Sequence, residues 1–326
     1  MNEIMRKLPI GIQTFEDIRR DNYLYVDKTA FVWQLANQGK PYFLARPRRF
    51  GKSLLLSTFE AYFKGQKDLF KGLAIDRMET DWRVYPVFHL DLNAEKYDSP
   101  DRLLQILDSH LNMWEDKYGK DIRDETISTR FSGIIRRASE ATGMRVVVLV
   151  DEYDKPLLQA LGNNELLEEY RKTLKAFYGV LKSADRYLRF VFLTGVTKFS
   201  QVSVFSDLNQ LNDISMNRSF AEICGITRQE LEANFQPEIK VFGQNNNQTP
   251  GEVLDIMEAN YDGYHFHPNS PGIFNPFSVL SAFFNRELGS YWFQTGTPTF
   301  LVEMLQKTNY DLRLLLDGIE APASSF

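Results

Sequence analysis

The chain has 326 residues, 43% of them hydrophobic, so it is long enough for a core domain followed by a smaller one. Its net charge of −5 gives no general attraction to nucleic acid or to an anionic membrane, and its single cysteine, Cys224, excludes an internal disulfide. The N-terminus lacks the apolar core of a signal peptide, and no apolar run is long enough to span a bilayer, so we expect a cytoplasmic protein.

The first predicted elements lead into a basic loop. Asp27 is placed to cap a helix over residues 28–36, and residues 41–45 form a short strand. The loop then runs over residues 46–53, with the sequence RPRRFGKS. Apolar residues recur through residues 53–63, which predicts a buried helix directly after the loop.

The end of this loop has the residues that phosphate binding requires. Gly51 lets the backbone approach a phosphate closely, Lys52 supplies a positive charge, and the Ser53 hydroxyl can hold Mg²⁺. The following helix directs its positive end at the same place. The candidate phosphate-binding residues are Arg46, Arg48, Arg49, Phe50, Gly51, Lys52 and Ser53.

Two features of the loop leave alternatives open. Arg46 stands where the pattern G-x-x-x-x-G-K-[ST] has its first glycine, and a G-K-S tripeptide alone also occurs by chance. The four cations of the loop could also form a solvated turn or contact a nucleic-acid backbone. We favour a small phosphate ligand, because Gly51 and the following helix suit an anion.

The next elements alternate between strands and helices. We expect a strand over residues 84–92, helices over 99–118 and 131–142, and a strand over 145–150. This last strand is apolar throughout, which is typical of a strand buried on both faces, and it ends in Asp151 and Glu152. Asp151 is a candidate ligand of Mg²⁺ through water, and Glu152 is a candidate base that positions the attacking water.

A third polar strand end follows a predicted helix over residues 165–184. The strand is apolar from residue 188 and ends in Thr194 and a glycine, so we expect Thr194 to sense a γ-phosphate. The basic loop, the acidic pair and Thr194 each lie at the carboxyl end of a predicted parallel strand. This is where α/β folds place ligands.

The predicted sheet is completed by a fifth strand over residues 220–225, because Thr227 and Glu230 form a capping box that starts a helix immediately afterwards. Five strands joined by crossover helices imply an α/β fold with a parallel sheet, flanked by helices as in P-loop NTPases. Arg218 precedes the fifth strand and is a candidate arginine finger, acting in its own chain or on a neighbour.

We expect a domain boundary near Gly225, with a core domain over residues 1–225 and a smaller, mostly helical lid over 226–326. Residues 236–250 are rich in Gln and Asn and are predicted to form a loop. Short helices are predicted at residues 251–260, 276–288, 298–307 and 311–316.

Six segments of the chain resemble the bacterial AAA-ATPase-like family: 25–29 (YVDKT), 46–53 (RPRRFGKS), 151–156 (DEYDKP), 261–264 (YDGY), 275–278 (NPFS) and 291–298 (YWFQTGTP). The resemblance implies a P-loop ATPase-like core whose lid senses bound ATP. An arginine in place of the first loop glycine is usual in that family. Many of its members continue into a nuclease-like domain of the PD-(D/E)XK superfamily, whereas this sequence stops at Phe326.

The expected function is therefore ATP binding with Mg²⁺-dependent hydrolysis, in which Lys52 and Glu152 act with Thr194 and Arg218. The alternative is a catalytically weak, nucleotide-gated module that regulates a C-terminal nuclease-like effector or a partner protein. A protein partner or a homo-oligomer is compatible with both readings. Direct nucleic-acid binding ranks last because of the net charge, and no membrane contact is expected.

Overall fold

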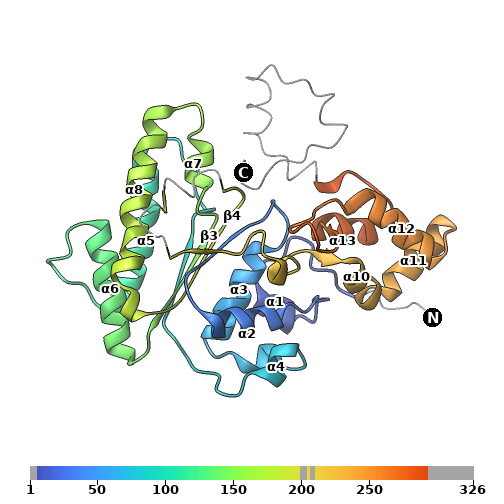
Figure 1. The fold of residues 1–326 in the computed structure, drawn as a ribbon, viewed down its shortest axis with the longest axis horizontal. Coiled ribbons are helices and arrows are strands. Elements are labelled where there is room, and N and C mark those ends of the chain that lie inside the picture. The colour runs from blue at the N-terminus through green and yellow to red at the C-terminus, as the bar shows by residue number, and fades with distance from the viewer. Residues whose placement is uncertain (1–5, 199–203, 206–209, 293–326) are drawn as a thin grey trace.

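The computed structural model describes residues 6–198, 204–205 and 210–292 (Figure 1). Its centre is a five-stranded sheet in which every neighbouring pair is parallel. In spatial order the strands are β2 (Val87–Asp91), β3 (Val146–Asp151), β4 (Leu188–Gly195), β1 (Tyr42–Ala45) and β5 (Asn212–Asp213). The predicted α/β fold with a five-stranded parallel sheet is thus confirmed.

The strand order brings three sequence motifs to one edge of the sheet. β4 lies between β1, which leads into the basic loop, and β3, which ends in the acidic pair. In the register Leu44 pairs with Thr194, while Val150 pairs with Leu193. The carboxyl ends of these three strands therefore meet, at the place where parallel sheets bind ligands.

Helices cover both faces of the sheet (Figure 1). Val146, Val148 and Val150 of β3 belong to a core shared with α5 (Pro100–Tyr118), α6 (Ile127–Thr142) and α8 (Asn164–Ser183). Val147 and Leu149 point to the opposite face, whose core includes residues of α1 (Phe15–Arg20), α2 (Thr29–Gln38), α3 (Lys52–Phe63) and α4 (Ala74–Met78). β3 is accordingly buried along its whole length, as its apolar sequence predicts.

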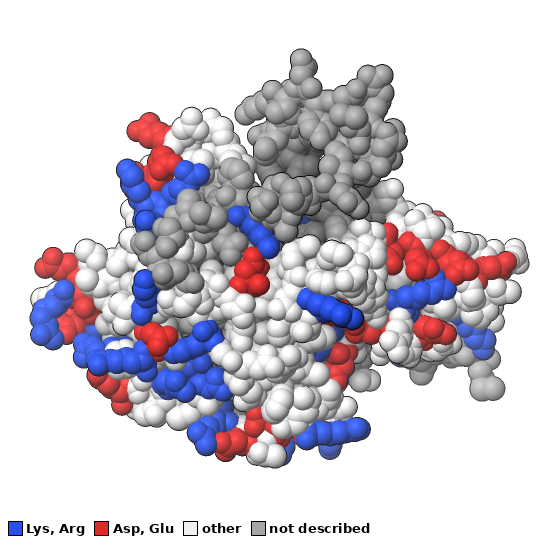
Figure 2. All heavy atoms as spheres, viewed as in Figure 1, with Lys and Arg blue, Asp and Glu red and all other residues white. Residues whose placement is uncertain are grey.

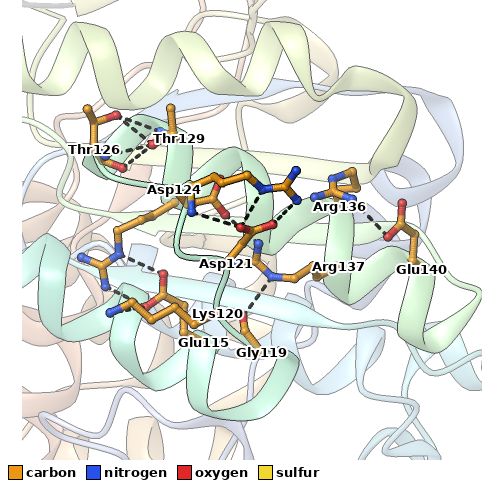
Figure 3. A network of polar contacts seen from close by, with 12 residues as sticks. Glu115, Gly119, Lys120, Asp121, Asp124, Thr126, Thr129, Arg136, Arg137 and Glu140 are labelled. Atoms are coloured by element: carbon orange, nitrogen blue, oxygen red, sulfur yellow. Dashed lines mark hydrogen bonds and ion pairs between the residues drawn. The ribbon is translucent and has the colours of Figure 1, made fainter.

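A polar network joins α5 to α6, two of the helices on the face of the sheet that α8 also covers (Figure 3). Arg130 donates to both carboxylate oxygens of the buried Glu115, each over 2.9 Å, which lowers the pKa of that carboxyl. Arg137 donates to Asp124 over 2.6 Å. Thr126 caps α6, which for that reason begins four residues before the predicted helix at residue 131.

The C-terminal part of the described chain has its own core. It comprises α10 (Arg228–Asn234), α11 (Gln236–Asn246), α12 (Pro250–Tyr261), α13 (Pro276–Asn285) and a two-stranded antiparallel sheet of β6 (Ile226–Thr227) and β7 (Ile273–Phe274). Leu8, Ile10, Leu24 and Val26 of the N-terminal segment pack against that core. The capping box of Thr227 and Glu230 is present at the start of α10, as predicted.

Two predicted elements are wrong. Residues 220–225 do not form the fifth strand: the 3₁₀ helix η3 (Arg218–Phe220) ends there, and β5 lies earlier, beside β1. The predicted loop at 236–250 contains α11, because Ile239 and Phe242 provide a buried side for a helix whose exposed residues are mostly polar.

The predicted helices at 298–307 and 311–316, and most of the 291–298 segment, lie outside the described residues. Within the described ranges, no helix combines the length and the apolar character needed to cross a bilayer.

Candidate functional site

The basic loop is a tight turn closed around Lys52. Gly51 has a φ of +91° and caps α3, a left-handed conformation that favours glycine. Arg49 is also left-handed, with a φ of +67°. The ammonium of Lys52 donates to the carbonyls of Arg46, over 3.0 Å, and Pro47, over 3.2 Å, and the side chain is only 5% exposed. Lys52 thus lies across the loop, where its charge faces any anion held at the start of α3.

Arg46 lies beneath the loop and does not face the predicted phosphate position. Its side chain is 1% exposed and donates to the carbonyls of Ser215, over 2.7 Å, and Phe220, over 3.1 Å. Burial lowers its pKa to about 10. The expected place of this side chain among the phosphate-facing cations is therefore corrected: both of its terminal nitrogens donate to backbone carbonyls, and it supports the loop from below.

The absence of the first pattern glycine has a structural explanation. Arg46 is not among the residues with positive φ, so this position does not require glycine. The turn is made instead at Arg49 and Gly51.

Asp151 and Thr194 form a buried pair at the ends of β3 and β4. The Thr194 hydroxyl donates to Asp151 Oδ1 over 2.7 Å, and both side chains are buried. The described lining of the neighbouring cavity does not include Thr194. The hydroxyl that was expected to sense a γ-phosphate is thus directed at Asp151, and the geometry suits orientation of that carboxylate.

Glu152 has an unusual backbone conformation for a residue with a side chain. Its φ is +51°, a left-handed value that costs free energy for a non-glycine residue and often marks functional sites. Burial raises the pKa of this carboxyl, while the nearby charge of Lys52 opposes the rise. Glu152 lines the same cavity as Lys52, so the structure brings together the candidate base and the candidate phosphate-binding lysine.

Asp154 holds the ends of β3 and β4 together. Its buried carboxylate accepts hydrogen bonds from the backbone N–H of Val196, over 3.0 Å, and of Thr197, over 2.8 Å. It also accepts from the Thr197 hydroxyl over 3.0 Å. Burial raises the pKa of Asp154, and the Thr197 and Val196 hydrogen bonds oppose this rise. Its role is to fix the strand ends beside the acidic pair.

A polar cavity of about 540 Å³ lies over the loop, within the range of small-molecule sites. The N-terminal segment, the start of α3, the end of β3 and α13 all contribute to its walls. Its lining residues are Pro9, Gly11, Ile12, Gln13, Arg48, Arg49, Gly51, Lys52, Ser53, Leu54, Asn93, Glu152, Lys155, Gln159, Pro276, Phe277 and Leu280. Four of these side chains are cationic and one is a carboxylate, so the lining attracts anions.

A smaller, mostly apolar cavity of about 100 Å³ adjoins the polar one. Pro9, Gly51, Leu54, Pro276 and Leu280 line both cavities. The smaller cavity extends between the N-terminal segment, α3 and the C-terminal helices, where the buried Cys224 also lies. The two cavities together offer a cationic compartment and an apolar compartment that meet at Gly51.

The residues fit a magnesium nucleotide better than a metal bound by protein alone. In the described part of the chain, no group of three or more His, Cys, Asp or Glu side chains could hold a metal ion. Mg²⁺ commonly takes only one or two protein ligands, together with phosphate oxygens and water. Ser53 lines the polar cavity, and the buried Asp151 directly precedes Glu152 of the lining, so both predicted ligands are compatible with that arrangement.

Arg218 is not brought into the site. It is exposed on η3 and is absent from the lining of the polar cavity. The lining residues Asn93 and Gln159 are not among the residues predicted from the sequence. The only signal for Asn93 is its place just after β2.

The C-terminal part of the described chain contacts the loop directly at three consecutive residues. The Trp292 indole donates to the carbonyl of Arg48 over 3.0 Å. The Arg49 guanidinium lies 4.9 Å from the centre of the Phe277 ring. The Phe50 ring lies 4.7 Å from that of Tyr264 in an edge-to-face contact. A change in the conformation of the loop would therefore alter direct contacts with the C-terminal part.

Comparison with known proteins gives a family match. A family model described as "Predicted AAA-ATPase" matches residues 9–205. A relative from Azotobacter chroococcum mcd 1, described as an uncharacterized protein in the vnfD 5' region, is 44% identical over 303 residues, which are 92% of this chain and 56% of the relative. The chain thus spans about half the length of that curated relative.

A solved structure, that of the E. coli MS115-1 HORMA:CdnC:Trip13 complex, aligns over 90% of this chain and 91% of the matched chain. The identity is 14% and the TM-score is 0.29, which is too low to indicate a shared fold.

Proposed function

We propose that this chain, which belongs to the AAA-ATPase-like family of predicted AAA-ATPases, binds ATP over its basic loop and hydrolyses it with Mg²⁺. One observation carries the proposal: the ends of β1 and β3 bring Lys52 and Glu152 to the same cationic cavity. The compartment that we propose for the protein is the cytoplasm.

The loop residues divide the binding of the phosphates. Lys52 holds the β- and γ-phosphates, and the backbone N–H groups around Gly51 cradle them at the positive end of α3. Ser53 and, through water, Asp151 hold the metal, with Thr194 orienting Asp151. When bound, Mg²⁺ neutralises part of the charge that develops on the phosphoryl group.

Glu152 positions the attacking water and accepts its proton. The raised pKa of this carboxyl lies closer to cellular pH than the pKa of an ordinary glutamate. This suits a group that must accept a proton at cellular pH. The base must be ionised to act, so turnover falls on acidification at a pH above the ordinary glutamate pKa of 4.5.

The nucleotide base occupies the small apolar cavity, next to the phosphate loop. The C-terminal helices close this cavity, and they constitute the lid that we assign to residues 226–326, after a core domain at 1–225. Lys28, at the start of α2, forms an ion pair of 2.5 Å with Glu230 of α10, which ties the N-terminal segment to the lid.

A calorimetric titration tests the proposal. Wild type, Lys52→Ala and a control, Lys172→Ala at an exposed position on α8, are titrated with ATP and Mg²⁺. The proposal requires binding by the wild type and the control, with at least tenfold loss in Lys52→Ala, since a hydrogen bond to a charged group contributes roughly 1.5–3 kcal/mol. Equal affinities of all three proteins would refute binding at this loop.

A second function is favoured by the contacts of Arg48, Arg49 and Phe50 with the lid. In this case the chain binds nucleotide, turns it over slowly and signals the bound state to a nuclease-like domain, a partner protein or a second copy. Nucleotide affinity with turnover equal to that of Lys52→Ala supports it. Nucleic acid is not proposed, because the net charge is negative and acidic and basic side chains are intermixed on the face shown in Figure 2.

A further inference from the structure

Lys155 is a fourth cation of the polar cavity, and it comes from a different element than Arg48, Arg49 and Lys52. It begins α7 (Lys155–Gln159), just after the acidic pair. Its backbone N–H donates to the carbonyl of Glu152 over 3.0 Å. The lysine and the candidate base therefore keep a fixed backbone relation.

Neutral groups hold the ammonium of Lys155. It donates to the carbonyl oxygen of Asn93 and, over 2.9 Å, to the side-chain Oδ1 of the same residue. Asn93 is fixed in turn, since its N–H donates to Asp91 Oδ1 over 2.7 Å at the end of β2. An ammonium has three protons to donate, so one remains for a further acceptor.

The ammonium of Lys155 has room for an anionic partner at hydrogen-bond distance. Among the described residues, no carboxylate lies within ion-pair distance of its ammonium, unlike Lys28 or Lys198. Partial burial lowers the pKa of Lys155, and Glu152 opposes this shift. Arg48 also acts against the charged form. Asp91 and Glu95 favour the charged form of Lys155 from outside the cavity lining. The lining itself has four cations and one carboxylate, so an anionic ligand there is attracted.

The position within the cavity indicates which part of the ligand Lys155 meets. Gly51 and Lys52 form the wall at the start of α3, whereas Asn93, Glu152 and Lys155 form the wall at the ends of β2 and β3. In the proposed function Glu152 positions the water that attacks the γ-phosphate, so the γ-phosphate would lie at the second wall. Arg218 does not line the cavity, whereas Lys155 does and comes from the element next to Glu152. Arg48, whose charge acts on both Glu152 and Lys155, adds positive charge at the same end.

We propose that Lys155 donates to the terminal phosphoryl group of a bound nucleoside triphosphate, so that the chain distinguishes triphosphate from diphosphate with a cation of its own. This rests on the proposed nucleotide site. A lysine that serves only to hold Asn93 and α7 would affect both nucleotides alike.

The test compares ADP with a non-hydrolysable β,γ-imido analogue of ATP by calorimetry, on wild type, Lys155→Met and a control, Lys172→Met. Lys155→Met should bind the analogue at least about tenfold more weakly than the wild type does, which corresponds to the loss of one hydrogen bond to a charged group. Its affinity for ADP should stay within about twofold of the wild-type affinity. Lys172→Met should match the wild type. An equal change for both nucleotides, or no change, overturns the inference and leaves the nucleotide site intact.

A second variant guards against a folding defect. Lys155→Gln keeps an amide donor for Asn93 but has no charge, and it should show the same selective loss of analogue affinity at an unchanged melting temperature. If Lys155→Gln distinguishes the two nucleotides as well as the wild type does, the inference is overturned. A wild type that binds neither nucleotide refutes the proposed function itself.

Discussion

The guanidinium of Arg46 lies 3.8 Å from the centre of the Phe266 ring. Arg46 follows the strand that leads into the basic loop, and Phe266 lies between α12 and β7, so a single contact joins the core to the C-terminal part. The same guanidinium donates to carbonyls of the segment around η3. Arg46 therefore fastens three separate segments beneath the loop.

Arg46→Gly restores the letters of the usual phosphate-loop pattern, yet we expect it to damage the protein. It empties a fully buried site and leaves the Ser215 and Phe220 carbonyls without their donor, at a cost of about 2–4 kcal/mol in the free energy of unfolding. Urea unfolding measures this loss in the free energy of unfolding. Arg46→Lys is a second variant, which keeps the positive charge but cannot reach both carbonyls. A stable Arg46→Gly with unchanged nucleotide affinity would contradict the supporting role.

Sequence patterns predicted the elements that have strong local signals. The uniformly apolar run before Asp151 identified β3, and the capping box at Thr227 identified the start of α10. β5 is only two residues long and has no pattern of its own, while Phe220 and Ile223 are buried in a turn and imitate a strand. Short edge strands depend on the neighbouring strand, so they are invisible to local patterns.

The site was predicted as a set of strand ends but not in its orientations. Lys52, Ser53 and Glu152 follow buried strands and line one cavity, and their functional roles stay predictions. The direction of a side chain depends on long-range partners, which the sequence does not reveal: Thr194 turns to Asp151, and Arg46 turns away from the cavity.

Glu152→Gln should stabilise the protein at pH 8. Burial raises the pKa of Glu152, so the stability linked to its protonated form is full below the ordinary pKa of 4.5 and is lost as the pH rises through the folded-state pKa. Glutamine avoids the cost of the buried charge and keeps the backbone conformation. The melting temperature of Glu152→Gln should exceed that of the wild type at pH 8. The difference should shrink toward pH 4, which is about half a unit below the ordinary glutamate pKa.

The exposed Glu232→Gln is the matched control for this comparison, and it should follow the wild type at both pH values. A Glu152→Gln protein that melts below the wild type at pH 8 would show that the ionised carboxyl is stabilised by its neighbours.

Thr194→Val separates orientation of Asp151 from direct sensing of a phosphate. Valine has a similar shape but leaves Asp151 without the 2.7 Å hydrogen bond. We expect the hydrolysis rate to fall about tenfold, the equivalent of roughly 1.4 kcal/mol, while ATP affinity changes by less than about twofold. Loss of ATP affinity with ADP affinity intact would instead show that the hydroxyl contacts the γ-phosphate. Thr142→Val in α6 controls for the loss of a hydroxyl.

Trp292→Phe tests the connection between the loop and the C-terminal helices. It removes the hydrogen bond to the Arg48 carbonyl and keeps an aromatic ring. In the wild type, ATP should slow amide hydrogen exchange in α13, and Trp292→Phe should reduce that protection; Trp33→Phe in α2 should not. Equal protection in the wild type and Trp292→Phe would mean that this contact transmits nothing.

The most direct measurement is steady-state release of phosphate from ATP with Mg²⁺ by the wild type, Lys52→Ala and Glu152→Gln. The account predicts turnover by the wild type that both variants abolish, while Glu152→Gln still binds ATP. Wild-type turnover that persists in Glu152→Gln would contradict the assigned base, and the same rate in Lys52→Ala would place the reaction outside this loop.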